Sequence, residues 1–116
     1  NGKLCYYLPD QDYGRKRAEF APFFAVKDTA TTTGTTLFAS SKHCKTVCFM
    51  SRRDEDGQYH LAITPMPDDF PSGNDLADVT LVNQGIERAV LNAPSQYMWL
   101  HRRFKTRPDE NSPSYY

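Results

Sequence analysis

The sequence has no apolar run that approaches the roughly 18 residues a membrane-spanning helix needs. Its three cysteines are too few, and odd in number, for a disulfide framework, which fits a reducing compartment. Basic and acidic residues number 14 each, so the formal net charge is zero, and no overall field draws the chain toward nucleic acid. The first residue is not methionine and no secretory signal follows it, which predicts a truncated, cleaved or excised piece.

What the sequence does contain suits one small folded domain. Hydrophobic residues make up 39% and charged residues 24%, values typical of a globular segment rather than a disordered one. Seven tyrosines and seven phenylalanines can supply a core, because each ring buries a large apolar area. The middle of the chain is acidic, and its end is basic at Arg102, Arg103, Lys105 and Arg107. This asymmetry favours a local anion site or a lipid-facing edge.

Several segments are predicted to be extended. Leu4–Leu8 is a short apolar run that Pro9 ends, as in a buried strand. Phe20–Val26 contains Pro22, which cannot donate to a strand ladder, so an edge strand or an extended loop is predicted there. A last short apolar piece, Met98–Leu100, is predicted to be a strand near the end of the chain.

A hairpin is predicted from Lys45–Met50 and Gln58–Thr64, which flank a charged turn. Because side chains alternate along a strand, each strand should carry an apolar face. The predicted apolar faces are Val47 and Phe49 on the first strand, and Tyr59, Leu61 and Ile63 on the second.

Two helices are predicted. The first should run from about Thr31 to Lys42 with Asp28 or Thr29 as its cap, although threonines and Gly34 are weak helix formers. The second should begin after Asn74 or Asp75 and run to about Asn92, with one buried stripe. That stripe consists of Val79, Val82, Ile86 and Val90. The resulting order of strand, helix, hairpin, helix and strand predicts an α/β fold.

Asp10 and Asp12 lie in a turn directly after the first predicted strand. Loops at strand ends are common ligand sites in α/β proteins, so paired carboxylates there could orient a base or hold a cation. The alternative, favoured by spacing alone, is a turn stabilised by aspartate side-chain hydrogen bonds.

Histidines and cysteines indicate no strong metal site. His43, Cys44 and Cys48 lack a second pair of ligands at zinc spacing, so buried, inert thiols are the favoured interpretation. His60 is predicted to be a surface histidine without a partner. His101 could contact phosphate or support the neighbouring arginines, and a packed, hydrogen-bonded position is the commoner outcome.

The basic end is interleaved with aromatic residues at Tyr97, Trp99 and Phe104. Guanidinium groups match phosphate oxygens, and aromatics beside cations suit a membrane interface. A solvated basic edge explains the composition equally well. No Ser–His–Asp set, P-loop or dinucleotide fingerprint occurs.

Five segments in chain order carry a resemblance to one known family: 7–14, 20–26, 30–34, 68–71 and 93–108. The most specific are Pro9-Asp10-Gln11-Asp12-Tyr13-Gly14 and Trp99-Leu100-His101-Arg102-Arg103-Phe104-Lys105-Thr106-Arg107-Pro108. Together they resemble the C-terminal portion of the lauroyl and myristoyl acyltransferases of lipid A biosynthesis, over nearly the whole chain.

The resemblance implies the α/β fold of the glycerolphosphate acyltransferases, a mixed sheet flanked by helices. It implies an enzyme at the cytoplasmic face of the bacterial inner membrane, without a cofactor or metal. This enzyme would move a fatty acyl chain from acyl carrier protein to a hydroxyl of a lipid A precursor. In that family a histidine, followed five positions later by an acidic residue, acts as general base on the hydroxyl.

This chain lacks such a dyad. Five positions after its three histidines stand Cys48, Pro65 and Thr106. The dyad is therefore expected in a preceding part of the protein, and the chain alone is expected to be inactive. An alternative is a stand-alone module that binds anionic glycolipid or acyl carrier protein.

The resemblance also assigns candidate residues within the chain. Asp12 matches the acidic loop position that is functionally important in the family, Asp10 is the weaker candidate, and Arg15 stands where relatives often have proline. The candidates for binding anionic lipid or closing the active-site wall are Arg102, Arg103, Lys105 and His101. Residues 1–106 are expected to belong to the acyltransferase domain, and residues 107–116 to form a loose tail.

Overall fold

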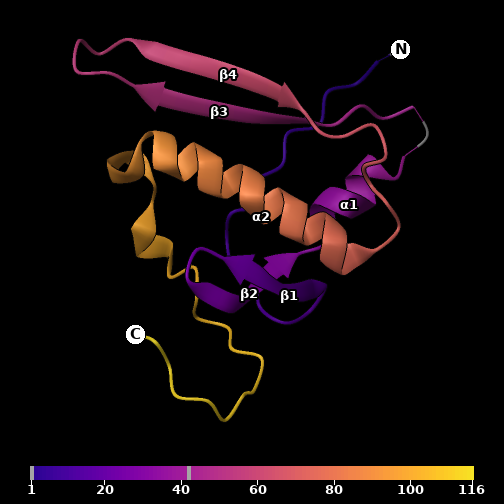
Figure 1. Cartoon of the computed structure of the whole chain (residues 1–116), viewed down its shortest axis with the longest axis vertical. Coiled ribbons are helices and arrows are strands. Elements are labelled where there is room, and N and C mark those ends of the chain that lie inside the picture. The colour runs from indigo at the N-terminus through magenta and orange to yellow at the C-terminus, as the bar shows by residue number, and fades with distance from the viewer. Residues whose placement is uncertain (1, 42) are drawn as a thin grey trace.

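A computed structural model describes residues 2–41 and 43–116 (Figure 1). It contains two antiparallel hairpins and two α-helices, followed by two single 3₁₀ turns. The elements are β1 (Ala18–Phe23), β2 (Val26–Thr32), α1 (Gly34–Ala39), β3 (Val47–Arg53), β4 (Tyr59–Pro65), α2 (Asp75–Asn92), η1 (Pro94–Gln96) and η2 (Trp99–His101). Figure 1 shows α2 between the β1–β2 hairpin and the β3–β4 hairpin.

The α/β class is therefore confirmed, but the strands form two separate antiparallel pairs rather than one mixed sheet within the described residues. None of the helices in that part of the chain has the length and apolar character of a membrane span.

The core lies between the β1–β2 hairpin and α2, which contribute buried apolar residues equally. Ala21 and Phe23 of β1 are fully buried, and α2 packs against this strand. The register shifts between Ala21 and Phe23, which accommodates Pro22 in an irregularity of the ladder. The predicted edge strand is confirmed here, because both strands of a two-stranded sheet are edges.

The first predicted helix is confirmed in part, because α1 lies within it, but its predicted start is wrong. Thr29, Ala30, Thr31 and Thr32 belong to β2, and the helix α1 covers only Gly34–Ala39. β-Branched threonines pack well on a pleated surface and lose rotamer freedom in a helix. Neither Asp28 nor Thr29 caps α1, since Thr33 occupies the N-cap position. The expected end at Lys42 lies outside the described residues.

The second predicted helix is confirmed as α2. Its N-cap is Asn74, whose side-chain oxygen accepts a hydrogen bond from the backbone N–H of Ala77 at 3.1 Å. Val79, Val82 and Val90 of the predicted stripe are buried, and Ile86 is half-buried. This helix forms because the apolar positions recur at helical spacing and face β1.

The predicted hairpin is confirmed as β3–β4, with Phe49 opposite Ile63 and Ser51 opposite Leu61. The predicted apolar faces lie on the side of the hairpin that points away from α2. Cys48 lies toward α2, since its Sγ is 3.6 Å from the point where a side chain at Gly85 would begin. Phe49 and Leu61 are consequently exposed to solvent.

Several shorter predictions are wrong. Leu4–Leu8 forms no strand, and Leu4 is 96% exposed, because no strand of the described residues pairs with this segment. Met98–Leu100 contributes to the 3₁₀ turn η2 instead of a strand. The thiol of Cys44 is exposed and that of Cys48 half-buried, so neither is a fully buried core residue. Partial burial raises the pKa of Cys48.

His60 has a partner, contrary to expectation. Its Nε2 lies 2.7 Å from Oδ2 of Asp54, across the turn between β3 and β4. This hydrogen bond is the main cause that lowers the pKa of Asp54, helped by the backbone N–H of Gln58. The interaction is exposed and close in sequence, so it organises the turn rather than the core.

We predict that His60→Ala raises the pKa of Asp54 toward the ordinary aspartate value of 3.8. A carboxyl with a lowered pKa stabilises the turn above the usual titration range, and that stabilisation is lost as pH falls through the lowered pKa. An NMR titration of the Asp54 carboxyl carbon measures this shift. Asp69→Ala is the control and should leave the titration of Asp54 unchanged; an unchanged titration in His60→Ala as well would contradict the assigned cause.

Candidate functional site

The two most specific sequence segments meet in space, although they lie about 90 residues apart. Asp12 is only 5% exposed and accepts three hydrogen bonds. The backbone N–H of Gly14 and the hydroxyl of Thr106 donate to its Oδ1, each at 2.8 Å. The backbone N–H of Thr106 donates to its Oδ2 at 2.8 Å. Both carboxylate oxygens of Asp12 are thus used to fasten the loop to the C-terminal ending.

A second set of contacts joins the same two segments through the backbone of Asp10. The hydroxyl of Tyr97 donates to the carbonyl oxygen of Asp10 at 3.2 Å, and Nε2 of His101 lies 3.1 Å from it. Nδ1 of His101 faces the carbonyl oxygen of Met98. Burial raises the pKa of Tyr97, and the nearby Asp10 raises it further, so its hydroxyl keeps its proton. His101 therefore occupies the packed, hydrogen-bonded position that sequence reasoning considered the commoner outcome.

The side-chain carboxyl of Asp10 differs from that of Asp12. Its Oδ1 is buried and has no hydrogen-bond partner among the described residues. A buried polar atom without a partner carries a desolvation cost of about 1–3 kcal/mol, which a substrate group or another segment could relieve. Asp10 is thus the carboxyl of this loop whose Oδ1 receives no hydrogen bond from the described residues.

Arg103 lies in the interior of the molecule and is 1% exposed. One guanidinium nitrogen donates to the carbonyl oxygen of Ala30, and the other donates to the hydroxyl oxygen of Thr31 at 3.0 Å. The guanidinium carbon lies 5.0 Å from the centre of the Phe23 ring. In this position Arg103 cannot contact a lipid outside the molecule. It ties the C-terminal ending to β1 and β2.

Asn83 completes this buried polar cluster from α2. Its Nδ2 donates to the hydroxyl oxygen of Thr31 and to the carbonyl oxygen of Pro22, both at 2.9 Å. Burial lowers the pKa of Arg103, whereas Tyr97, Asp12 and Asp10 raise it. Arginine remains charged at neutral pH. The carboxylates of Asp10 and Asp12 therefore lie near a buried positive charge. Sequence reasoning missed Asn83, and the available signal was a polar residue within the apolar stripe of the helix.

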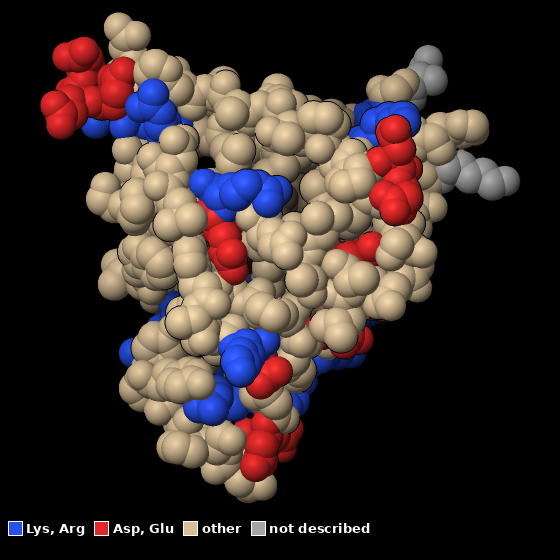
Figure 2. Space-filling view, in the orientation of Figure 1, with Lys and Arg blue, Asp and Glu red and all other residues tan. Residues whose placement is uncertain are grey.

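The exposed cations of the ending are Arg102 and Lys105. Arg102 has a left-handed backbone, with φ of 55°, and its guanidinium lies 5.8 Å from the ring centre of Tyr116. Figure 2 shows lysine and arginine side chains close to aspartate and glutamate side chains over the face in view, with no broad area of one sign there.

The tail at residues 107–116 folds back on the loop. Arg15 donates to the carbonyl oxygen of Pro108 at 2.7 Å and forms an ion pair with Glu110 at 2.9 Å. The guanidinium of Arg107 lies 3.8 Å from the ring centre of Tyr115. Arg15 thereby connects the loop to the tail.

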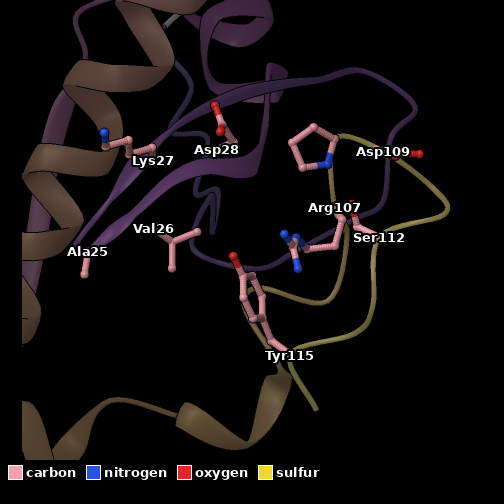
Figure 3. A pocket seen from close by; sticks show the side chains of 9 residues that line it. Ala25, Val26, Lys27, Asp28, Arg107, Asp109, Ser112 and Tyr115 are labelled. Carbon is pink, nitrogen blue, oxygen red and sulfur yellow. The ribbon is translucent and has the colours of Figure 1, made fainter.

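A hollow of about 400 Å³ lies between the β1–β2 turn and this tail (Figure 3). Its lining residues are Ala25, Val26, Lys27, Asp28, Arg107, Pro108, Asp109, Ser112 and Tyr115. Two basic side chains face it together with two acidic ones, so its formal charge favours no anion. No three potential metal ligands cluster within the described residues either.

Residues 1–106 match the family described as bacterial lipid A biosynthesis acyltransferase. This chain belongs to that family. It is 48% identical to a lipid A biosynthesis acyltransferase of Haemophilus influenzae over 98% of this chain and 37% of that protein. It is 44% identical to the palmitoleoyltransferase of Escherichia coli over 98% of this chain and 37% of the relative. The E. coli lauroyltransferase is also 44% identical, over 99% of this chain and 38% of the relative.

The chain thus spans little more than a third of the length of these relatives. The family match ends at Thr106, the residue that binds Asp12, and the tail lies beyond it. The loop that contains Asp10 and Asp12 and the ending that it contacts both lie within the matched residues.

Proposed function

We propose that this chain is the C-terminal part of an enzyme that transfers a fatty acyl chain from acyl carrier protein to a hydroxyl of a lipid A precursor. The whole enzyme would have the glycerolphosphate-acyltransferase-like fold and act at the cytoplasmic face of the inner membrane. The family membership and the fastening of the acidic loop to the ending support this proposal. The catalytic histidine and its acidic partner would come from the remainder of the enzyme.

Within that enzyme we assign different roles to the two loop aspartates. Asp12 holds the loop in place, since both its oxygens are already bound within the chain. Asp10 has a buried carboxyl oxygen that lacks a partner among the described residues. A carboxylate of this kind can accept a hydrogen bond from the acceptor sugar or from the catalytic histidine.

A chimera tests this proposal. This chain would replace the matching third of the H. influenzae acyltransferase, and acyl transfer from acyl carrier protein to a lipid A precursor would be measured. The chimera should be active and the isolated chain inactive. Asp10→Asn in the chimera should lower the rate by more than about tenfold. Asp109→Asn in the tail is the matched control and should retain the rate.

Activity of the isolated chain would contradict the missing dyad. A folded chimera without activity would contradict the proposed function. Equal rates for Asp10→Asn and its control would remove the role assigned to Asp10.

The exposed Arg102 and Lys105 support a second candidate, a module that binds anionic glycolipid. Sedimentation of the isolated chain with vesicles that carry lipid A precursor measures this binding. The double variant Arg102→Ala, Lys105→Ala should weaken it, whereas Lys27→Ala, Lys45→Ala removes the same charge elsewhere and should not. Absent binding, or equal loss in both variants, excludes the module.

A further inference from the structure

The β3–β4 hairpin carries an exposed apolar face. Phe49 is 47% exposed, and Leu61 and Ile63 are 63% and 65% exposed. Phe49 lies opposite Ile63, so these side chains share one face of the hairpin. Val47 and Tyr59 extend the same face at its two ends.

Charge enters this face only at the end next to the turn, where Arg53 lies opposite Tyr59. Within Val47–Pro65, every lysine, arginine, aspartate and glutamate falls between Arg52 and Asp56, at the last two residues of β3 and in the turn that follows. Figure 2 agrees, since the region where Figure 1 places the hairpin is uncharged between its two ends. A continuous apolar surface of this kind marks a contact surface in soluble proteins.

The hairpin also lacks the support that a two-stranded sheet needs. Each of its strands pairs only with the other strand among the described residues, and the side chain of Gln96 binds the backbone of Arg53 at one end of β3. An isolated pair of strands is marginally stable in water unless a helix or further strands cover it. Here α2 contacts β3, but every residue of β4 is exposed.

We propose that, in the whole acyltransferase, the β3–β4 apolar face is covered by the part of the enzyme that this chain does not include. The relatives contain nearly two thirds of their length beyond this match, which is ample chain to form the cover. This inference rests on the proposed function only in naming the covering polypeptide as the remainder of an acyltransferase.

The position of the N-terminal segment supports this occupant. Figure 1 draws the first residues at the same end of the molecule as β3 and β4, and the C-terminus at the other end. The view looks along the shortest axis, which spans 20 Å, so depth separates them little. Leu4, Tyr6 and Leu8 of this segment are also exposed apolar residues. Polypeptide preceding this segment would enter beside the hairpin.

The charges around the hairpin oppose a membrane as the occupant. At its tip Asp54, Glu55 and Asp56 follow Arg52 and Arg53, so acidic residues outnumber basic ones there, whereas surfaces that bind anionic lipid are rimmed by lysine and arginine.

Cysteine accessibility tests the proposal. Leu61→Cys and Ile63→Cys would be made in the isolated chain and in the chimera with the H. influenzae acyltransferase, and labelling by a maleimide would be mapped to each site by mass spectrometry. Glu55→Cys, at the exposed tip, is the control. Labelling of both apolar sites should be on the order of tenfold or more slower in the chimera, with the control unchanged. Because this readout does not require catalysis, an inactive but protected chimera supports the inference while contradicting the proposed function.

Equal labelling in both proteins would overturn the inference. Protection in the isolated chain that grows with its concentration would assign the face to a second copy, and protection only with added vesicles would assign it to a membrane. Either result would also overturn it.

A charge substitution gives a second measurement. The double variant Leu61→Asp, Ile63→Asp should leave the thermal transition of the isolated chain unchanged but lower that of the chimera. Ala62→Asp, on the opposite face of the same strand, is the control. Unfolding of the isolated double variant would show that the face is already packed, and would contradict the proposal.

Discussion

Replacing Arg103 with methionine is expected to lower the free energy of unfolding by about 3 kcal/mol. Methionine fills much of the same space but donates no hydrogen bonds. The carbonyl oxygen of Ala30 and the hydroxyl of Thr31 then lose a charged donor in a buried position. The link from the C-terminal ending to β1 and β2 is lost with it. Urea unfolding followed by circular dichroism measures the change.

Arg102 provides the matched control, because it is the adjacent arginine and its side chain is exposed. Arg102→Met should change the free energy of unfolding by less than about 0.5 kcal/mol. Arg103→Lys should fall between the two, since an ammonium cannot reproduce the planar fork that reaches two acceptors. It also remains measurable if Arg103→Met does not fold. Equal stabilities for the variants at positions 102 and 103 would contradict the structural role of Arg103.

Asp12→Ala is expected to lower the free energy of unfolding by about 2 kcal/mol, because it removes three accepted hydrogen bonds from a buried site. The amide of Thr106 should also exchange faster with deuterium, since its acceptor is gone. Asp69→Ala, at an exposed position, is the control and should change neither quantity.

A double-mutant cycle isolates the contact between the two segments. Thr106→Val removes the hydroxyl donor but keeps the backbone N–H, so its effect should not add to that of Asp12→Ala. The coupling free energy should be about 1 kcal/mol. Strict additivity would show that the hydroxyl of Thr106 contributes nothing to the stabilisation by Asp12.

Sequence patterns correctly predicted the elements that are stabilised by contacts between residues close in the sequence. The periodicity from Val79 to Val90 and the cap at Asn74 specify α2, and alternation specifies the β3–β4 hairpin. The start of the helix predicted from Thr31 was wrong because Thr31 and Thr32 pair with β1 as part of β2, and pairing with another strand is not visible in a short window. The strand predicted at Leu4–Leu8 failed for a related reason, since an apolar run becomes a strand only where a partner edge exists.

The candidate site was predicted in part. Composition marked Asp12 and the basic ending as notable, and the family resemblance joined them to one enzyme. Nothing in their spacing showed that Asp12 binds Thr106 or that Arg103 points inward while Arg102 points outward. The left-handed backbone at Arg102 reverses the direction of the chain between two adjacent arginines, and arginine is an uncommon residue at positive φ.

The contact between Asp12 and Thr106 also has a consequence for the order of events during synthesis. The two residues are separated by 94 positions, so the acidic loop cannot reach its final geometry until Thr106 has been made. Local elements such as α2 can form earlier, because their contacts lie within a few residues. A ribosome that stalls before residue 106 would therefore release a polypeptide with its helix but without its acidic loop in place. The acidic loop around Asp12 therefore reaches its final geometry only after Thr106 has been added.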